Sequence, residues 1–132
     1  MKRPRVLVLT GYGINCDYET EYAFNHPNVG GDAKRVHIND IIDGRELLDR
    51  YQILAFPGGF SFGDDIAAGR VLAAKFEFSL GEKLKKFVDD GKLVLGICNG
   101  FQAMTKLKIL PATDGANSQE ATLTFNDSGR FS

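Results

Sequence analysis

Cys98 lies in the motif Gly96-Ile-Cys-Asn-Gly100, between an apolar run and a segment with helical periodicity. This is the cysteine form of the nucleophile elbow, a sharp strand-to-helix turn that lifts a nucleophile out of the backbone. A Cβ at either glycine would crowd such a turn, and the start of a helix stabilises a thiolate. The N–H of Asn99 is then placed to donate to an oxyanion. The alternative is a small buried cysteine beside two turn glycines, but the position between strand and helix favours catalysis.

A second glycine-rich loop, Pro57-Gly-Gly-Phe60, follows another apolar run. Missing side chains allow a substrate to approach the backbone closely, so a backbone N–H of this loop can supply a second oxyanion donor. Taken alone, Pro-Gly-Gly is an ordinary turn between a strand and a helix. Taken together with the elbow, it favours a site.

The other candidate residues are less indicative of a catalytic or binding role. Gly11-Tyr-Gly13 departs from the dinucleotide-binding fingerprint, because its third glycine would fall at Cys16. We expect Cys16 to lie at a helix start or to pack, and Asp64-Asp65 to cap a helix. A nucleophilic cysteine needs a base, yet neither histidine of the sequence, His26 or His37, has a placement that obviously reaches Cys98.

The elements that must position these residues alternate along the chain. Apolar runs without polar alternation predict strands buried on both faces, and repeats of three and four residues predict helices. Ile14, Tyr18 and Tyr22 mark the apolar face of the first helix, capped by Asn15 or Asp17, and Gly91 ends a later helix. The predicted strands are 6–9, 35–38, 53–56 and 93–95, and the predicted helical segments are 15–25, one turn within 41–51, a region around 80–88, and one containing Phe101, Met104 and Leu107.

This order predicts an α/β fold with an open, mostly parallel sheet and helices on both faces. The ends of parallel strands lie at one edge of the sheet, where ligands bind. We therefore expect the loops 11–13, 57–60 and 96–100 to gather there. Residues 121–125 alternate like a strand, and the turn at 126–129 is followed by only three residues, so we expect a single domain over 1–132 that lacks its C-terminal part.

The composition of the chain excludes several classes of protein. The chain has 132 residues, with 16 Lys and Arg against 17 Asp and Glu, so its net charge of −1 does not favour nucleic acid or an anionic membrane as a partner. Two cysteines and two histidines without metal-ligand spacing predict neither a disulfide framework nor a zinc site. No apolar run reaches membrane-spanning length. We expect a soluble, cytoplasmic domain.

With the elbow and the Pro-Gly-Gly loop located, the chain resembles the glutaminase subunits of phosphoribosylformylglycinamidine synthases, within the class I glutamine amidotransferases of flavodoxin-like fold. The resemblance covers nearly the whole chain, in the family's order. The matching stretches are Asn15-Cys-Asp17, Phe56-Pro-Gly-Gly-Phe-Ser-Phe-Gly-Asp64, Leu95-Gly-Ile-Cys-Asn-Gly-Phe-Gln102 and Asn126-Asp-Ser-Gly-Arg-Phe131.

The resemblance implies that Cys98 attacks the side-chain amide of glutamine, giving a glutamyl thioester and ammonia for de novo purine biosynthesis. The N–H groups of Gly59 and Asn99 would form the oxyanion hole, and Phe60 and Gln102 would bind the glutamine. The ammonia would pass to a synthetase subunit, in a complex that can include a small third subunit. ATP and magnesium belong to that synthetase, so no cofactor is expected in this chain.

The sequence also departs from the family, because the family's His and Glu lie beyond residue 132 and no His-x-Glu occurs here. General acid–base help is worth about 10²–10⁴-fold, so we expect weak or no turnover by this chain alone. One alternative is a docking or regulatory module that keeps the fold without catalysis. Another is a Cys-elbow protein of the peptidase or redox-chaperone kind.

Overall fold

Among the described residues, four short strands form one parallel sheet, in the order β2-β1-β3-β4. The computed structural model describes residues 2–11, 14–58 and 66–107. The strands are β1 (Arg5–Thr10), β2 (Asp32–His37), β3 (Ile53–Phe56) and β4 (Leu93–Gly96). The helices are α1 (Asp17–Asn25), α2 (Ile38–Ile42), α3 (Ile66–Asp89) and α4 (Asn99–Lys106), with a 3-10 turn at Leu48–Arg50.

The strand order confirms the predicted α/β fold with an open parallel sheet. The chain runs from β1 outward to β2 and then returns to β3 on the other side of β1. Such a reversal is the topological switch point of a doubly wound sheet, beside which ligands bind at the carboxyl ends of the strands. Gly11, Gly58 and Ile97, which follow β1, β3 and β4, all lie at that edge, whereas 12–13 and 59–60 of the predicted loops lie outside the described residues.

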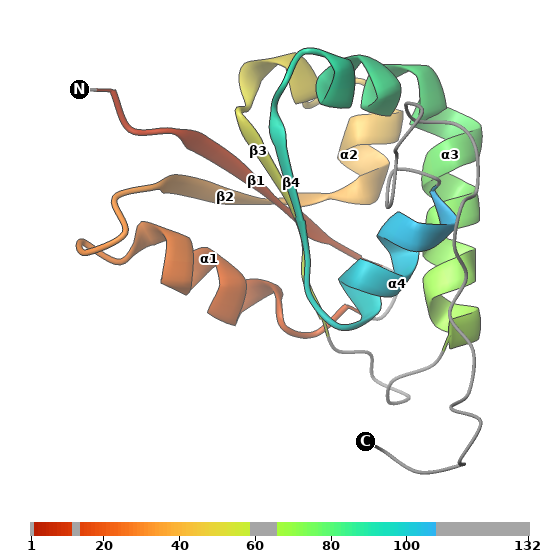
Figure 1. The fold of residues 1–132 in the computed structure, drawn as a ribbon, viewed down its shortest axis with the longest axis horizontal. Helices are drawn as coiled ribbons and strands as arrows, with labels where there is room; N and C mark the ends of the chain where they lie inside the picture. Colours follow the sequence, from red (N-terminus) through yellow and green to blue (C-terminus); the bar gives the residue numbers. More distant parts are fainter. Residues whose placement is uncertain (1, 12–13, 59–65, 108–132) are drawn as a thin grey trace, which may run out of the picture.

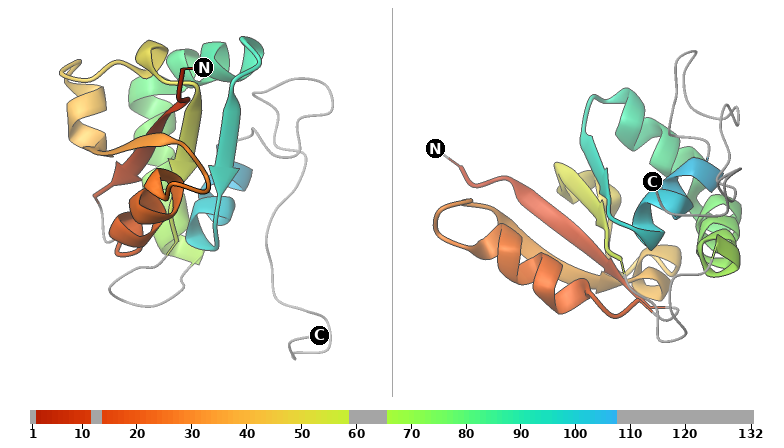
Figure 2. Two further views of the ribbon diagram at one scale, coloured as in Figure 1. Left: turned by 90° about the vertical axis from the view of Figure 1, so that its left-hand side faces the viewer. Right: turned by 60° about the horizontal axis from the view of Figure 1, so that its bottom comes forward.

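Helices cover the two faces of the sheet unequally (Figures 1 and 2). α1 contacts β1 and β2 on one face, and α2, α3 and α4 lie on the other, where α4 contacts β3 and β4. We call these the α1 face and the α3/α4 face. No helix among the described residues has the length and apolar character needed to cross a membrane.

The side chains of the strands divide between two apolar clusters because successive residues of a strand point to opposite faces. The cluster on the α3/α4 face joins Leu7, Leu9, Leu54 and Phe56 to helix residues such as Phe87. The cluster on the α1 face contains the strand residues Val6, Val8, Ala33 and Ala55, with Phe24 of α1 packed against them.

The first helix differs from its prediction in both its cap and its face. Its N-cap is Cys16, which makes no side-chain capping hydrogen bond, so neither Asn15 nor Asp17 caps it. Tyr18 and Tyr22 are 62% and 72% exposed, whereas Asp17 and Thr20 are buried. The predicted apolar stripe is wrong because an ion pair turns Asp17, one residue before Tyr18, toward the sheet.

Other elements confirm the prediction with shifted boundaries. β2 begins at Asp32, three residues earlier than predicted, and Ile38 already belongs to α2. Gly91 has φ of +79° just after α3, as a left-handed helix end requires. β4 is a strand, but it is not buried on both faces, since Leu93 is 64% and Leu95 42% exposed. The predicted hairpin within 121–132 lies outside the described residues.

Candidate active site

Cys98 occupies a strained turn between β4 and α4. It has φ of +54° and ψ of −112°, and no other non-glycine residue of the described part has a positive φ. A side chain in this region costs about 1–3 kcal/mol, and such strain is typical of functional sites. The residue is exposed and forms the N-cap of α4. This is the geometry of a nucleophile elbow, as the sequence predicts.

The two glycines of the motif are required by close packing. A Cβ at Gly100 would overlap the carbonyl oxygen of Phe56, and one at Gly96 would overlap the sulfur of Met104 and lie 2.8 Å from the Phe101 nitrogen. The turn is closed by a 2.8 Å hydrogen bond from the Gly100 N–H to the Ile97 carbonyl. The prediction that a Cβ at either glycine would crowd the turn is confirmed.

The loop after β3 lies against this elbow. A Cβ at Gly58 would come within 3.0 Å of the Cβ of Cys98 and 2.9 Å of the Ile97 carbonyl oxygen. The Ile97 N–H donates to the Phe56 carbonyl at 3.0 Å. The structure thus brings the 57–58 part of one predicted loop to the nucleophile. Gly59, Phe60 and Asp64-Asp65 lie outside the described residues.

The first turn of α4 supplies two more of the predicted groups. Asn99 is the first residue of the helix, where backbone N–H groups lack an acceptor within the helix. The Gln102 N–H donates to the Cys98 carbonyl at 3.1 Å. The Gln102 side chain is half-buried, and its Oε1 is buried without a hydrogen-bond partner among the described residues. A buried carbonyl oxygen without a donor is costly and is available to a ligand.

Neither histidine lies where it could serve Cys98. The His37 side chain accepts from the Asn39 N–H at 3.0 Å and caps α2, and its ring packs on Gly11. His37 is on β2 and Cys98 follows β4, three strand spacings apart, which corresponds to about 14 Å. The His26 Nδ1 accepts from the Asn28 N–H at 3.2 Å in the turn after α1. Both histidines have structural contacts, and the described residues contain no cluster able to hold a metal ion.

A buried polar network lies at the start of α1. The Asp17 carboxylate accepts from the Thr10 hydroxyl at 2.9 Å and pairs with Arg35 at 3.5 Å. The Cys16 N–H donates to the Gly58 carbonyl at 3.2 Å. Sequence reasoning expected Cys16 at a helix start and missed the network, because Arg35 lies 18 residues from Asp17.

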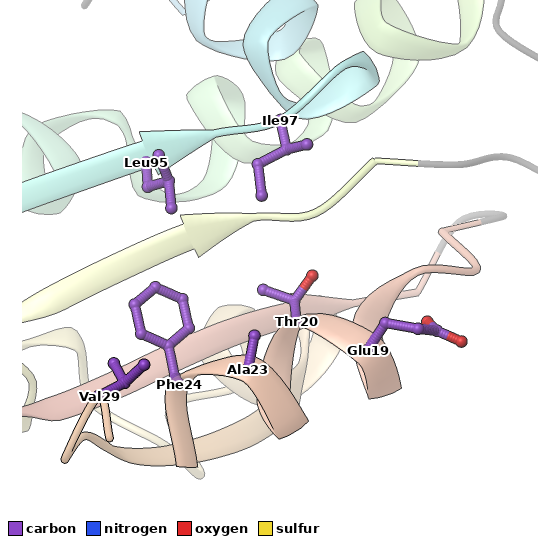
Figure 3. A pocket seen from close by; sticks show the side chains of 7 residues that line it. All are labelled: Glu19, Thr20, Ala23, Phe24, Val29, Leu95 and Ile97. Atoms are coloured by element: carbon purple, nitrogen blue, oxygen red, sulfur yellow. The ribbon is translucent and has the colours of Figure 1, made fainter. Parts of the chain in front are cut away.

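An apolar groove of about 360 Å³ runs between α1 and the end of β4 (Figure 3). Leu95 and Ile97 form one wall of the groove, and Phe24 and Ala23 of α1 form the other. The remaining lining residues are Glu19, Thr20 and Val29. Ile97 precedes the nucleophile, so the groove begins directly beside the elbow.

Comparison with known proteins shows the family and the fold of the chain. The model of the CobB/CobQ-like glutamine amidotransferase domain matches residues 3–132. The chain belongs to this family. Among curated glutamine amidotransferase relatives, the phosphoribosylformylglycinamidine synthase subunit PurQ of Dehalococcoides mccartyi is 49% identical over 133 residues, covering 99% of this chain and 50% of the relative. The subunit PurQ of Methanococcus maripaludis is 51% identical over 130 residues, covering 97% of this chain and 47% of the relative.

A solved structure shares the amidotransferase fold. A chain in the structure of PurLQS from Thermotoga maritima superposes with a TM-score of 0.71 at 29% identity, covering 98% of this chain and 51% of that chain. The amidotransferase chain described here therefore spans about half the length of the curated relatives it matches.

Proposed function

We propose that this chain carries the nucleophile of a glutaminase that supplies ammonia to phosphoribosylformylglycinamidine synthase. The observation that carries the proposal is the elbow itself, an exposed cysteine at φ +54° on the N-cap of α4. Membership of the glutamine amidotransferase family supports glutamine as the substrate, and the names of the relatives support the link to the synthase.

In the proposed reaction, the Cys98 thiolate attacks the side-chain carbonyl carbon of glutamine. The new S–C bond pushes the carbonyl electron pair onto oxygen, and the tetrahedral oxyanion accepts hydrogen bonds from backbone N–H groups. Collapse of this intermediate breaks the C–N bond, and the amide nitrogen leaves as ammonia after taking a proton. Water then hydrolyses the thioester to glutamate and regenerates the thiol.

The proposed oxyanion donors are the N–H groups of Asn99 and Gly59. The position of Asn99 at the start of α4 supports its part, and the close approach of Gly58 to Cys98 supports a contribution from the loop after β3. Gln102 and Phe60 are proposed to hold the glutamine. The Oε1 of Gln102, which is buried and has no hydrogen-bond partner within the part of the chain that the structure describes, supports this role, because a substrate ammonium or amide group would satisfy it.

The ammonia is proposed to pass to a synthetase subunit, in a complex that can include a small third subunit. The relatives are named as synthase subunits, and the solved structure is of PurLQS. ATP and magnesium would be used by the synthetase, and the proposal needs no cofactor in this chain.

Turnover by the 132 residues alone is proposed to be weak, because both histidines of the sequence have contacts away from Cys98. Loss of general acid–base catalysis costs about 10²–10⁴-fold in rate. In this proposal, thioester formation takes place at the elbow, and proton transfer depends on groups outside the described site.

The test is the intact mass of the chain after incubation with a glutamine analogue carrying a diazoketone. We expect one adduct, mapped to Cys98 by peptide analysis, that is absent from the Cys98→Ala variant and is suppressed by excess glutamine. A folded chain that reacts with iodoacetamide at Cys98 but never with the analogue would overturn the proposal. That result, combined with tight binding of a synthetase subunit, would instead favour a docking module without catalysis.

A further inference from the structure

The start of α1 is held by a buried carboxylate. Asp17 is 6% exposed, and a carboxylate removed from water is costly unless charged or polar partners compensate it. Its Oδ2 accepts the Thr10 hydroxyl at 2.9 Å and lies 3.5 Å from the Arg35 Nη1. Arg35 is itself fixed, because its guanidinium lies over the Tyr18 ring at 3.5 Å and its Nε is 3.5 Å from Glu21. Asp17 therefore ties the first turn of α1 to the end of β1 and to the interior of β2.

This anchoring fixes the backbone of Cys16, the preceding residue. The Cys16 carbonyl accepts from the Thr20 N–H at 3.2 Å and from the Thr20 hydroxyl at 2.7 Å. On its other side, the Cys16 N–H donates to the Gly58 carbonyl at 3.2 Å. Because α1 has no side-chain cap, the position of this N–H depends on the contacts of the first turn.

Gly58, which accepts this hydrogen bond, also packs against the nucleophile. Its α-carbon packs so closely on the elbow that an added Cβ would lie 3.0 Å from the Cys98 Cβ. A trans peptide is planar, so the carbonyl of one residue and the N–H of the next point in opposite directions. The hydrogen bond from Cys16 thus sets the direction of the Gly58 carbonyl. In Figure 1 the first turns of α1 and α4 lie at the same end of the sheet.

We propose that Asp17, held by Thr10 and Arg35, is a positioning residue that orients the peptide after Gly58 for stabilisation of the oxyanion at Cys98. The inference rests on the proposed glutaminase function and deepens it. Asp17 acts through the Cys16–Gly58 hydrogen bond and touches neither substrate nor nucleophile. Its removal is therefore expected to weaken the response to a developing oxyanion while leaving the thiol itself reactive.

The test compares two probes of Cys98 on the full chain. The aldehyde analogue of glutamine forms a tetrahedral adduct with the Cys98 thiolate. An S–C bond forms, the π bond of the carbonyl breaks, and its electron pair moves onto the oxygen, which accepts hydrogen bonds from the oxyanion donors. Iodoacetamide alkylates the same sulfur by displacing iodide and creates no oxyanion. Adduct formation at Cys98 is followed by peptide mapping, which separates it from reaction at Cys16.

We expect Asp17→Ala to weaken aldehyde affinity by about 10- to 100-fold, since loss of one oxyanion donor costs about 10²–10³-fold in rate. The rate of alkylation by iodoacetamide should change by less than about twofold. Asp17→Asn keeps an acceptor for the Thr10 hydroxyl, so its aldehyde affinity should lie between those of Asp17→Ala and the original chain. Glu19→Ala removes an exposed carboxylate from the same helix and is the matched control, with no change toward either probe.

The other possible results of this comparison each contradict either the positioning role of Asp17 or the proposed function. Equal losses toward both probes, or no loss toward either, would overturn the positioning role while leaving the proposed function intact. If the unaltered chain is alkylated by iodoacetamide but ignores the aldehyde, the proposed function fails and takes this inference with it. Should Asp17→Ala not fold, Thr10→Val removes only the hydroxyl donor, and the same selective loss, smaller in size, is required of it.

Discussion

The two faces of the sheet differ in how completely helices cover them. On the α3/α4 face, Leu7, Leu9, Leu54 and Phe56 are fully buried beneath helices that also pack on each other. On the α1 face, α1 is the single helix of the described residues that covers β1 and β2, and Ile97, beyond the end of β4, is 46% exposed in the groove. We call the α3/α4 face the closed face. The elbow lies between the two faces, since α4 packs on the closed face while Ile97 points into the groove (Figure 3).

This difference shows what holds the nucleophile. The strain at Cys98 persists only if its surroundings enforce it. Those surroundings belong to the closed face, where Gly96 packs on Met104 and Gly100 on the Phe56 carbonyl. The closed face therefore determines the backbone geometry of Cys98, and we expect the free energy of unfolding to respond to that face far more than to the other.

The largest expected effect is that of Gly100→Ala. The new methyl group would overlap the Phe56 carbonyl oxygen, so α4 must move away from β3. We expect a loss of about 3–5 kcal/mol in the free energy of unfolding, together with loss of selective diazoketone labelling at Cys98. Chemical denaturation and intact mass measure the two.

Gly91→Ala serves as the control for Gly100→Ala. Gly91 has a φ of +79° but nothing lies near its added methyl, so only backbone strain is introduced, worth about 1–2 kcal/mol. Equal effects of the two substitutions would mean that the elbow is not tightly packed on the closed face.

A matched pair of leucines compares the two faces directly. Leu54 on β3 is fully buried on the α3/α4 face, whereas Leu95 on the neighbouring β4 is exposed toward the α1 face. Leu54→Ala should lower the free energy of unfolding by about 2–5 kcal/mol, and Leu95→Ala by less than about 0.5 kcal/mol. Denaturant titration of both variants checks this. Similar losses would show that the α1 face is closed in solution.

The pH dependence of stability sharpens the account of the closed face. Burial, reinforced by the nearby Glu46 carboxylate, raises the pKa of Tyr51 to about 12. Below pH 10 this tyrosine is protonated in both states. As the pH rises from 10 toward 12, the unfolded chain releases the proton while the folded chain retains it, so this contribution to stability is lost.

The measurement is the difference between the original chain and Tyr51→Phe in the free energy of unfolding, taken at pH 9 and at pH 11.5. We expect the difference to change in favour of the phenylalanine variant by on the order of 2 kcal/mol as the pH rises. All other groups are the same in the two proteins, so their contributions cancel in the difference. An unchanged difference would mean that Tyr51 is accessible to water.

The closed face and the elbow were the parts most readily predicted from the sequence. The runs Val6–Leu9 and Ile53–Phe56 indicate strands because burial on both faces requires uninterrupted apolar residues. The elbow was predicted because its determinants, two glycines around a cysteine at the end of a strand, are all local. The same locality made the left-handed turn at Gly91 predictable.

The α1 face was predicted less well, because its determinants are distant in the sequence. The spacing of Tyr18 and Tyr22 resembles an apolar helix face, yet the partner that orients α1 is Arg35, a strand residue far along the chain. Likewise, the run Leu93–Leu95 predicts a strand, but no short window of sequence shows whether a neighbouring element covers each of its faces. Periodicity identifies what a segment prefers, whereas coverage depends on the rest of the fold.

The smallest expected effect on stability belongs to the exposed side of β4. Leu93 and Leu95 point toward the α1 face, and Val94 between them packs against the cluster on the α3/α4 face. The double variant Leu93→Ser, Leu95→Asn should change the free energy of unfolding by less than about 0.5 kcal/mol. Because contiguous exposed apolar surface binds hydrophobic dyes, the variant should roughly halve the fluorescence of an anilinonaphthalene sulfonate dye bound to the native chain.

Val94→Asn is the control for this double variant, since it lies on the same strand but faces the other way. Burying its amide against apolar residues should cost about 1–3 kcal/mol and leave dye binding to the native chain unchanged. The two variants thus separate the sides of one strand by two independent readouts. If the double variant proved as destabilising as Val94→Asn, β4 would be covered on both sides, and the elbow would be supported from both faces of the sheet.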